Sequence, residues 1–78
     1  MIEPSQCRAA RGLLNWTQDD LATAAGIGIV TVRNFENEKS VPIRATLDVI
    51  RRAFEKAGVE FTNGDEPGLK LKAKGKRK

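Results

Sequence analysis

The chain has 78 residues, 40% of them hydrophobic and 31% charged, which is typical of a single small folded domain. It has one cysteine and no histidine, so an internal disulfide is excluded, and we expect neither a metal site nor a cofactor. No apolar run approaches the roughly 20 residues of a membrane-spanning helix, and the N-terminal segment lacks the pattern of a signal peptide, so we expect a cytoplasmic protein without membrane contact.

The net charge of +4 is concentrated at one end of the sequence. Residues 70–78 carry six basic and no acidic residues, so residues 1–69 keep 14 less 6, or 8, basic residues against 10 acidic ones. The body of the chain is therefore close to −2, and bulk charge alone is a poor argument for binding to DNA. For residues 73–78 we predict a disordered basic tail, which either adds nonspecific affinity for DNA or only aids solubility.

The first predicted helix covers residues 5–14. Pro4 suits a first helical position, and Asn15 tolerates the left-handed conformation that closes helices. Three apolar residues then recur at spacings of three and four on one face, namely Cys7, Ala10 and Leu14.

The second predicted helix, residues 18–25, has the strongest start signal in the sequence. Thr17 can accept hydrogen bonds from the free amides of the first turn, and Asp20 can reach back as in a capping box. Trp16 and Leu21 flank this cap at the spacing of a hydrophobic staple.

A short glycine turn separates this helix from the third. Gly26 can take a positive φ, and the third predicted helix then covers Gly28–Glu38. Val32 and Phe35 are spaced to face a core, and two helices joined by so short a turn must cross steeply. The residues on the remaining surface of this helix are Ile29, Val30, Arg33, Asn34 and Asn37.

A fourth helix and a hairpin complete the predicted fold. The helix ends at Gly58, and its apolar face consists of Leu47, Ile50, Ala53 and Phe54. Residues 59–72 alternate apolar with polar residues on both sides of a run of turn formers, so they predict a β-hairpin. An isolated hairpin is marginal in water, so its apolar side chains must pack on the helical body or pair with a second copy.

Several short motifs fall at the positions where one known family has them: Thr17-Gln18, Leu21-Ala22, Gly26-Ile27, Val32, Phe35-Glu36 and Thr46-Leu47. With the first helix, they resemble the Cro/repressor-type helix-turn-helix proteins, also called lambda-repressor-like or xenobiotic-response-element proteins, over roughly residues 5–57. The resemblance implies a mostly α fold, with a compact four-helix DNA-binding domain over residues 1–58, followed here by the hairpin. Two departures are Gly28, where a Ser or Thr usually caps the third helix, and Ile43 at the cap of the fourth.

The free face of the third helix carries the predicted base-reading residues, Ile29, Val30, Arg33 and Asn34. Arginine pairs bidentately with guanine, asparagine pairs with adenine, and aliphatic groups pack against the thymine methyl group. Two alternatives stay open at this stage. Ile29 or Val30 could instead extend the core, and Arg33 could be a solvated charge.

Further residues are candidates for contacts with the DNA backbone. The resemblance implies that Gln18, at the start of the second helix, anchors a phosphate, and the other candidates are Thr31, Asn37, Lys39 and Arg44. The resemblance also implies an ion pair between Arg11 and Glu36, which we interpret as structural.

These observations favour a sequence-specific transcriptional regulator of double-stranded DNA, most simply a repressor. We expect a homodimer formed through residues 59–72 on a near-palindromic site, with no small-molecule effector. We do not expect an enzyme, because the sequence shows no histidine, no nucleophile with a nearby base and no phosphate loop. The alternatives are a DNA-binding antitoxin or phage-type control protein with a protein partner, and an interaction adaptor that has lost DNA binding.

Overall fold

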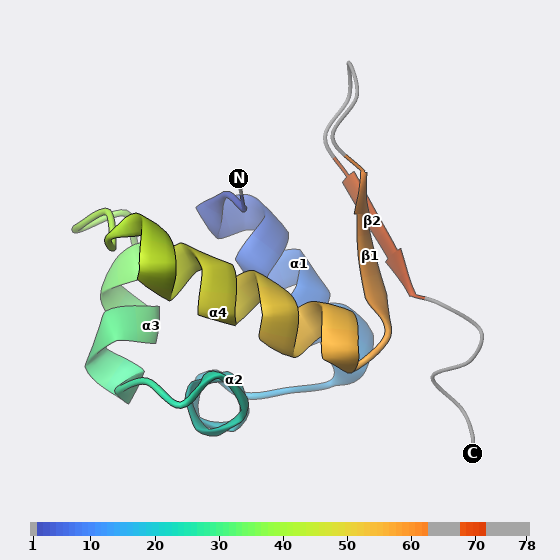
Figure 1. The fold of residues 1–78 in the computed structure, drawn as a ribbon, viewed down its shortest axis with the longest axis horizontal. Coiled ribbons are helices and arrows are strands. Elements are labelled where there is room, and N and C mark those ends of the chain that lie inside the picture. Colours follow the sequence, from blue (N-terminus) through green and yellow to red (C-terminus); the bar gives the residue numbers. More distant parts are fainter. Residues whose placement is uncertain (1, 63–67, 72–78) are drawn as a thin grey trace.

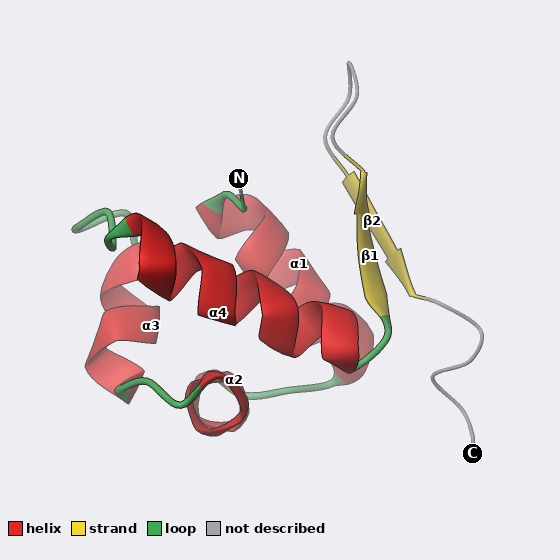
Figure 2. Ribbon diagram, viewed as in Figure 1, coloured by secondary structure: helices red, strands yellow, loops and turns green. Residues whose placement is uncertain are grey.

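The computed structural model describes residues 2–62 and 68–71, which form four helices followed by a two-stranded sheet (Figure 1). The elements are α1 (Pro4–Leu14), α2 (Gln18–Ala25), α3 (Ile29–Glu36), α4 (Arg44–Lys56), β1 (Val59–Thr62) and β2 (Gly68–Leu71). The mostly helical fold class predicted from the sequence is confirmed (Figure 2). Within the described ranges, none of the helices has the length and apolar character needed to cross a membrane. The predicted basic tail, residues 73–78, lies outside the described residues.

The first two helices end as their sequences predict. Asn15 and Gly26 both take the left-handed conformation, with φ of 58° and 71°. In each case the next amide reaches back to the last turn: the N–H of Trp16 donates to the carbonyl of Arg11 (2.8 Å), and that of Ile27 to the carbonyl of Ala22 (3.0 Å). These bonds satisfy carbonyls that a helix end otherwise leaves free.

The start of α2 has the predicted capping box. The N–H of Asp20 donates to Thr17 Oγ1 (3.0 Å), and the N–H of Thr17 donates to Asp20 Oδ2 (2.9 Å). The reciprocal pair satisfies two free amides and fixes the first turn of α2.

The third helix is shorter than predicted. Gly28 lies before the helix as its N-cap, and α3 ends at Glu36 rather than at Glu38. The reason is a left-handed residue, Glu38 (φ 61°), which lets the N–H of Lys39 donate to the carbonyl of Asn34 (2.9 Å). This is the same type of closing turn as in α1 and α2, but here the left-handed position is occupied by glutamate instead of glycine or asparagine.

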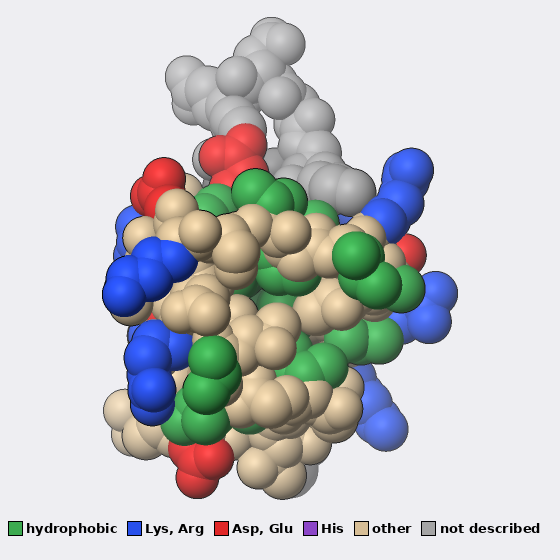
Figure 3. Space-filling view, turned by 90° about the vertical axis from the view of Figure 1, so that its left-hand side faces the viewer, with side chains coloured by type: hydrophobic (Ala, Val, Ile, Leu, Met, Phe, Trp, Pro, Cys, Tyr) green, Lys and Arg blue, Asp and Glu red, His purple; other side chains and the backbone are tan. Residues whose placement is uncertain are grey.

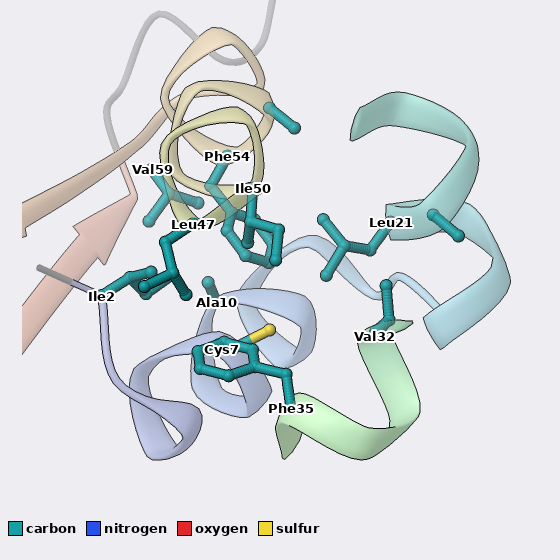
Figure 4. Packing of buried hydrophobic residues seen from close by; sticks show 12 residues of the cluster. Ile2, Cys7, Ala10, Leu21, Val32, Phe35, Leu47, Ile50, Phe54 and Val59 are labelled. Carbon is teal, nitrogen blue, oxygen red and sulfur yellow. The ribbon is translucent and has the colours of Figure 1, made fainter. Parts of the chain in front are cut away.

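The core lies where the four helices meet (Figure 4). Val32 and Phe35 of α3 are buried, as their spacing predicts, and so are the four predicted core residues of α4. The largest fully buried side chains are Phe54, Leu21, Ile50, Val32, Val59 and Cys7. These side chains come from α1, α2, α3, α4 and β1. Every element that precedes β2 therefore contributes to one shared core, which orients these elements relative to one another.

The two strands pair antiparallel, with Val59 opposite Leu71 and Phe61 opposite Leu69. Strand β1 follows α4 and packs against it, and β2 lies beside α1. Val59 is fully buried, and the half-buried ring of Phe61 lies with its centroid 6.1 Å from that of Phe54. The hairpin therefore packs against the helical body, which is one of the two partners expected for its apolar side chains. Residues 63–67 and 72 of the predicted hairpin lie outside the described residues.

Candidate nucleic-acid interface

Helices α2 and α3 form a tight pair. Only residues 26–28 join them, and in Figure 1 α2 is seen end-on while α3 lies in the plane of the view, so the two helices cross steeply. Ala22, on the buried side of α2, is 4% exposed. A small side chain at this place allows two helices to approach closely. The arrangement presents α3 at one side of the molecule.

Burial divides α3 into two faces. Val32, Phe35 and Glu36 are at most 3% exposed, whereas Val30 is 57% exposed and Arg33 is also exposed. Two of the predicted base-reading side chains, Val30 and Arg33, are therefore exposed on the face turned away from the core. On the corresponding side of the molecule, basic and acidic side chains both stand at the margins, with hydrophobic side chains between them (Figure 3).

The other two predicted base-reading residues are less free. Asn34 is half-buried, and Ile29 is half-buried with its side chain packed against the core. Among the residues that the structure describes, no side-chain hydrogen bond or ion pair engages Arg33 or Asn34. Their polar groups are thus available to a ligand on this face.

The predicted phosphate-binding residues lie around the same helix pair. Gln18 is the half-buried first residue of α2, and Thr31 lies half-buried in the first turn of α3. The remaining three are exposed after the end of α3 or at the start of α4, namely Asn37, Lys39 and Arg44. Asp19 and Asp20 also place two carboxylates in the first turn of α2, beside Gln18. These charges favour the helix start but oppose the approach of a phosphate.

Arg11 and Glu36 form a bidentate ion pair between α1 and the last residue of α3. Arg11 Nε donates to Glu36 Oε2 and Arg11 Nη2 donates to Glu36 Oε1, both at 2.7 Å. The side chain of Glu36 is 2% exposed and that of Arg11 is 20% exposed. A third bond, from Arg11 Nη1 to the carbonyl of Trp16 (3.0 Å), ties the same guanidinium to the α1–α2 connection.

The buried carboxylate of Glu36 has two more partners that sequence reasoning missed. Gln18 Nε2 donates to Oε1 (3.1 Å), and the thiol of Cys7 donates to Oε2 (3.1 Å). In addition, Arg8 Nη1 donates to the backbone carbonyl of Glu36. The Glu36 cluster, as we call Glu36 with Arg8, Arg11, Gln18 and Cys7, thus joins α1, the start of α2 and the end of α3. No local pattern could have indicated it, because Cys7 and Gln18 lie 29 and 18 residues from Glu36.

The cluster holds Glu36 as a carboxylate. Burial by itself raises the pKa of Glu36, but the hydrogen bonds from Arg11, Cys7 and Gln18 and the charge of Arg11 outweigh it and lower the pKa below its ordinary value. The pKa of the Cys7 thiol is raised, first by burial and then by its hydrogen bond to Glu36. Cys7 therefore stays a protonated donor, which is a structural role and not that of a nucleophile.

Comparison with known proteins agrees with this geometry. The two crossed helices and the exposed face of α3 define a helix-turn-helix protein. A family model described as Helix-turn-helix matches residues 8–61, which is well over half of the chain, and the chain belongs to this family in its lambda-repressor/Cro type. It is thus a DNA-binding transcriptional regulator, of a family that is not enzymatic. No significant match to a curated protein was found.

Proposed function

We propose that this regulator is a sequence-specific repressor that inserts α3 into the major groove of double-stranded DNA. The observation that supports the proposal is the division of α3 into a buried face, with Val32 and Phe35, and an exposed face, with Val30 and Arg33. A helix held in this way on a small body can enter a groove about 12 Å wide with its N-terminal half. Where the bound site lies within a promoter, the protein occludes it, and repression then follows from occupancy of the site.

In this proposal the base contacts come from the four predicted residues. Arg33 pairs with guanine and Asn34 with adenine, because these side chains match the hydrogen-bonding edges of those bases. Val30 and the outer part of Ile29 make apolar contacts. Each well-placed bidentate contact contributes about 1–3 kcal/mol of discrimination between bases.

The phosphate contacts position the helix on the duplex. Gln18 keeps one amide hydrogen for a phosphate while its other hydrogen is donated to Glu36, and the amides of the α2 start lie beside it. The other proposed contacts are Thr31, Asn37, Lys39 and Arg44. Since the body of the chain, residues 1–69, carries more acidic than basic residues, we expect this part to contribute little nonspecific binding and to draw a large share of its affinity from base contacts.

We further propose that the repressor is a homodimer joined through residues 59–72. The sheet consists of β1 and β2 within the described residues, and a two-stranded sheet has an unpaired edge on each strand that a second copy can extend. Two copies related by a two-fold axis would place their α3 helices about 34 Å apart on a near-palindromic site. A mass that stays at 8.6 kDa in light scattering at all micromolar concentrations would contradict the dimer.

Selection of binding sites from random duplexes tests the proposed function. The wild type should recover one motif that contains guanine and adenine, and the double variant Arg33→Ala, Asn34→Ala should lose the preference for these bases. Arg52→Ala serves as a matched control, because Arg52 is exposed on α4 and should leave the motif unchanged.

Two results would contradict the proposal in different ways. Recovery of no motif by the wild type would favour an interaction adaptor, with which the acidic body is compatible. A motif that the double variant reads unchanged would show that side chains other than Arg33 and Asn34 lie in the groove.

A further inference from the structure

Val30 is an aliphatic side chain that is not part of the hydrophobic core. It is 57% exposed at the second position of α3, although valine is a poor helix former and most exposed helix positions in this chain are polar. The other large hydrophobic side chains that are exposed in the described residues lie outside α3, namely Leu13, Val41 and Ile43. An exposed valine on the face that enters DNA is therefore suited to contact an apolar group in the groove.

Arg33 is the neighbour of Val30 on this face. Residues three apart on a helix have Cβ atoms about 5–6 Å apart, and the guanidinium of Arg33 has no side-chain partner among the described residues. Base pairs stack at about 3.4 Å along the helix axis, so the Cβ atoms of Val30 and Arg33 are separated by about two base-pair steps. The pair thus combines an apolar group and a guanine-binding group at a fixed spacing.

Ile29 does not share this role to the same degree. Its side chain is half-buried against the core, while that of Val30 is more than half exposed. The difference arises because consecutive side chains of a helix point about 100° apart. When Ile29 points toward the core, Val30 therefore points toward solvent. The main contact with an apolar group in the groove is therefore assigned to Val30.

The apolar group in the major groove that differs between bases is the methyl group on C5 of a pyrimidine. Thymine carries it, whereas cytosine presents an amino donor and no methyl group. We propose that Val30 reads a pyrimidine 5-methyl group within about two base pairs of the guanine bound by Arg33. This inference rests on the proposed function, and it adds a consequence: 5-methylcytosine offers the same group, so methylation of a cytosine at this position would strengthen binding.

The experiment uses the motif recovered by the wild type. Each thymine is replaced in turn by uracil, which removes only the methyl group, and the dissociation constant is measured for the wild type and for Val30→Ala. Burial of one methyl group corresponds to about a fourfold change in affinity. We expect one uracil substitution to weaken wild-type binding about fourfold, and the same substitution to change the binding of Val30→Ala by less than about twofold.

A second arm separates the two sources of the methyl group. At the same position, a duplex with 5-methylcytosine is compared with one that has cytosine, and methylation should strengthen wild-type binding about fourfold but not the binding of Val30→Ala. Val41→Ala is the matched control, because Val41 is an 85% exposed valine outside α3 and its loss should leave both methyl effects intact.

The outcomes distinguish this inference from the proposed function. A wild type that recovers no motif overturns both. A motif in which no thymine methyl group matters, or in which the methyl effect persists unchanged in Val30→Ala, overturns the role of Val30 and leaves the proposed function standing.

Discussion

The two ends of α3 are constructed in opposite ways. At the C-terminal end, the carboxylate of Glu36 is almost fully buried and accepts hydrogen bonds from Arg11, Gln18 and Cys7. At the N-terminal end, Gly28 has no side chain to cap the helix, and Val30 points away from the core. The C-terminal end is held by side-chain hydrogen bonds from two other helices, whereas the N-terminal end has no side-chain cap and is held by the packing of Ile29 against the core.

The residues that hold the C-terminal end of α3 in position are therefore different from the residues proposed to contact bases. A carboxylate at a helix C-terminus is opposed by the helix dipole, so Glu36 is stable there only because of its partners. Those partners fix where α3 lies on the body without using any side chain of the exposed face. The exposed base-reading residues Val30 and Arg33 can therefore change without loss of the fold, provided that the Glu36 cluster stays intact.

The largest effect should come from breaking the cluster. Arg11→Ala leaves the charge of Glu36 buried without its ionic partner, which typically costs 3–5 kcal/mol. Because Arg11 keeps 20% of its side-chain surface exposed, we expect the free energy of unfolding to fall by about 3 kcal/mol, at the lower end of this range. Urea unfolding followed by the fluorescence of Trp16, which stacks on Phe54 in the core, measures the change.

The exposed ion pair of α4 provides the control. Arg51 Nε lies 2.9 Å from Glu55 Oε2, with both side chains more than a third exposed. Glu55→Ala should therefore lower the free energy of unfolding by less than about 1 kcal/mol. Equal losses in the two variants would show that the Arg11–Glu36 pair is no more important than a surface pair.

A smaller effect is expected from pH, because protonation of Glu36 removes its charge but keeps its atoms in place. The pKa of Glu36 is lowered in the folded state, so its contribution to stability is present above the unfolded-state pKa of about 4.3 and is lost as the pH falls through the lower, folded-state pKa. The difference in unfolding free energy between the wild type and Glu36→Gln should thus shrink as the pH is lowered from 7 to 3. A difference that is constant over this range would mean that Glu36 does not titrate with folding.

The parts of this fold that the sequence predicted are those with local signals. The cap formed by Thr17 and Asp20 and the stop at Gly26 each depend on residues a few positions apart, so they can be recognised before any tertiary contact is known. The end of α3 was misplaced because Glu38 takes a left-handed conformation that glutamate rarely adopts.

The candidate site follows the same rule. The spacing of Val32 and Phe35 predicted which side of α3 faces the core, and the exposure of Val30 and Arg33 agrees with it. The Arg11–Glu36 pair was reached only through a family resemblance. The contributions of Cys7, Arg8 and Gln18 could not be predicted, since side-chain contacts between distant segments leave no periodic pattern.

The smallest effect is expected at the free end of α3. Gly28 has φ −75° and ψ 149°, which any residue can adopt, and a Cβ atom built there meets nothing within 4 Å. Gly28→Ser should therefore be accommodated without strain and should supply the missing cap, which is worth a few tenths of a kcal/mol relative to glycine. For a domain of this size the melting temperature should rise by about 1–3 °C.

Gly28→Ala distinguishes the cap from the mere addition of a side chain. Alanine adds a Cβ without an oxygen that accepts a hydrogen bond, so it should not raise the melting temperature. In one outcome, Gly28→Ser is more stable than the wild type but binds the selected motif at least tenfold more weakly, and Gly28→Ala binds equally weakly. Glycine would then be required at this position because it allows the DNA to approach closely. If both variants bind as the wild type does, the start of α3 is free because the reading face begins only at Val30.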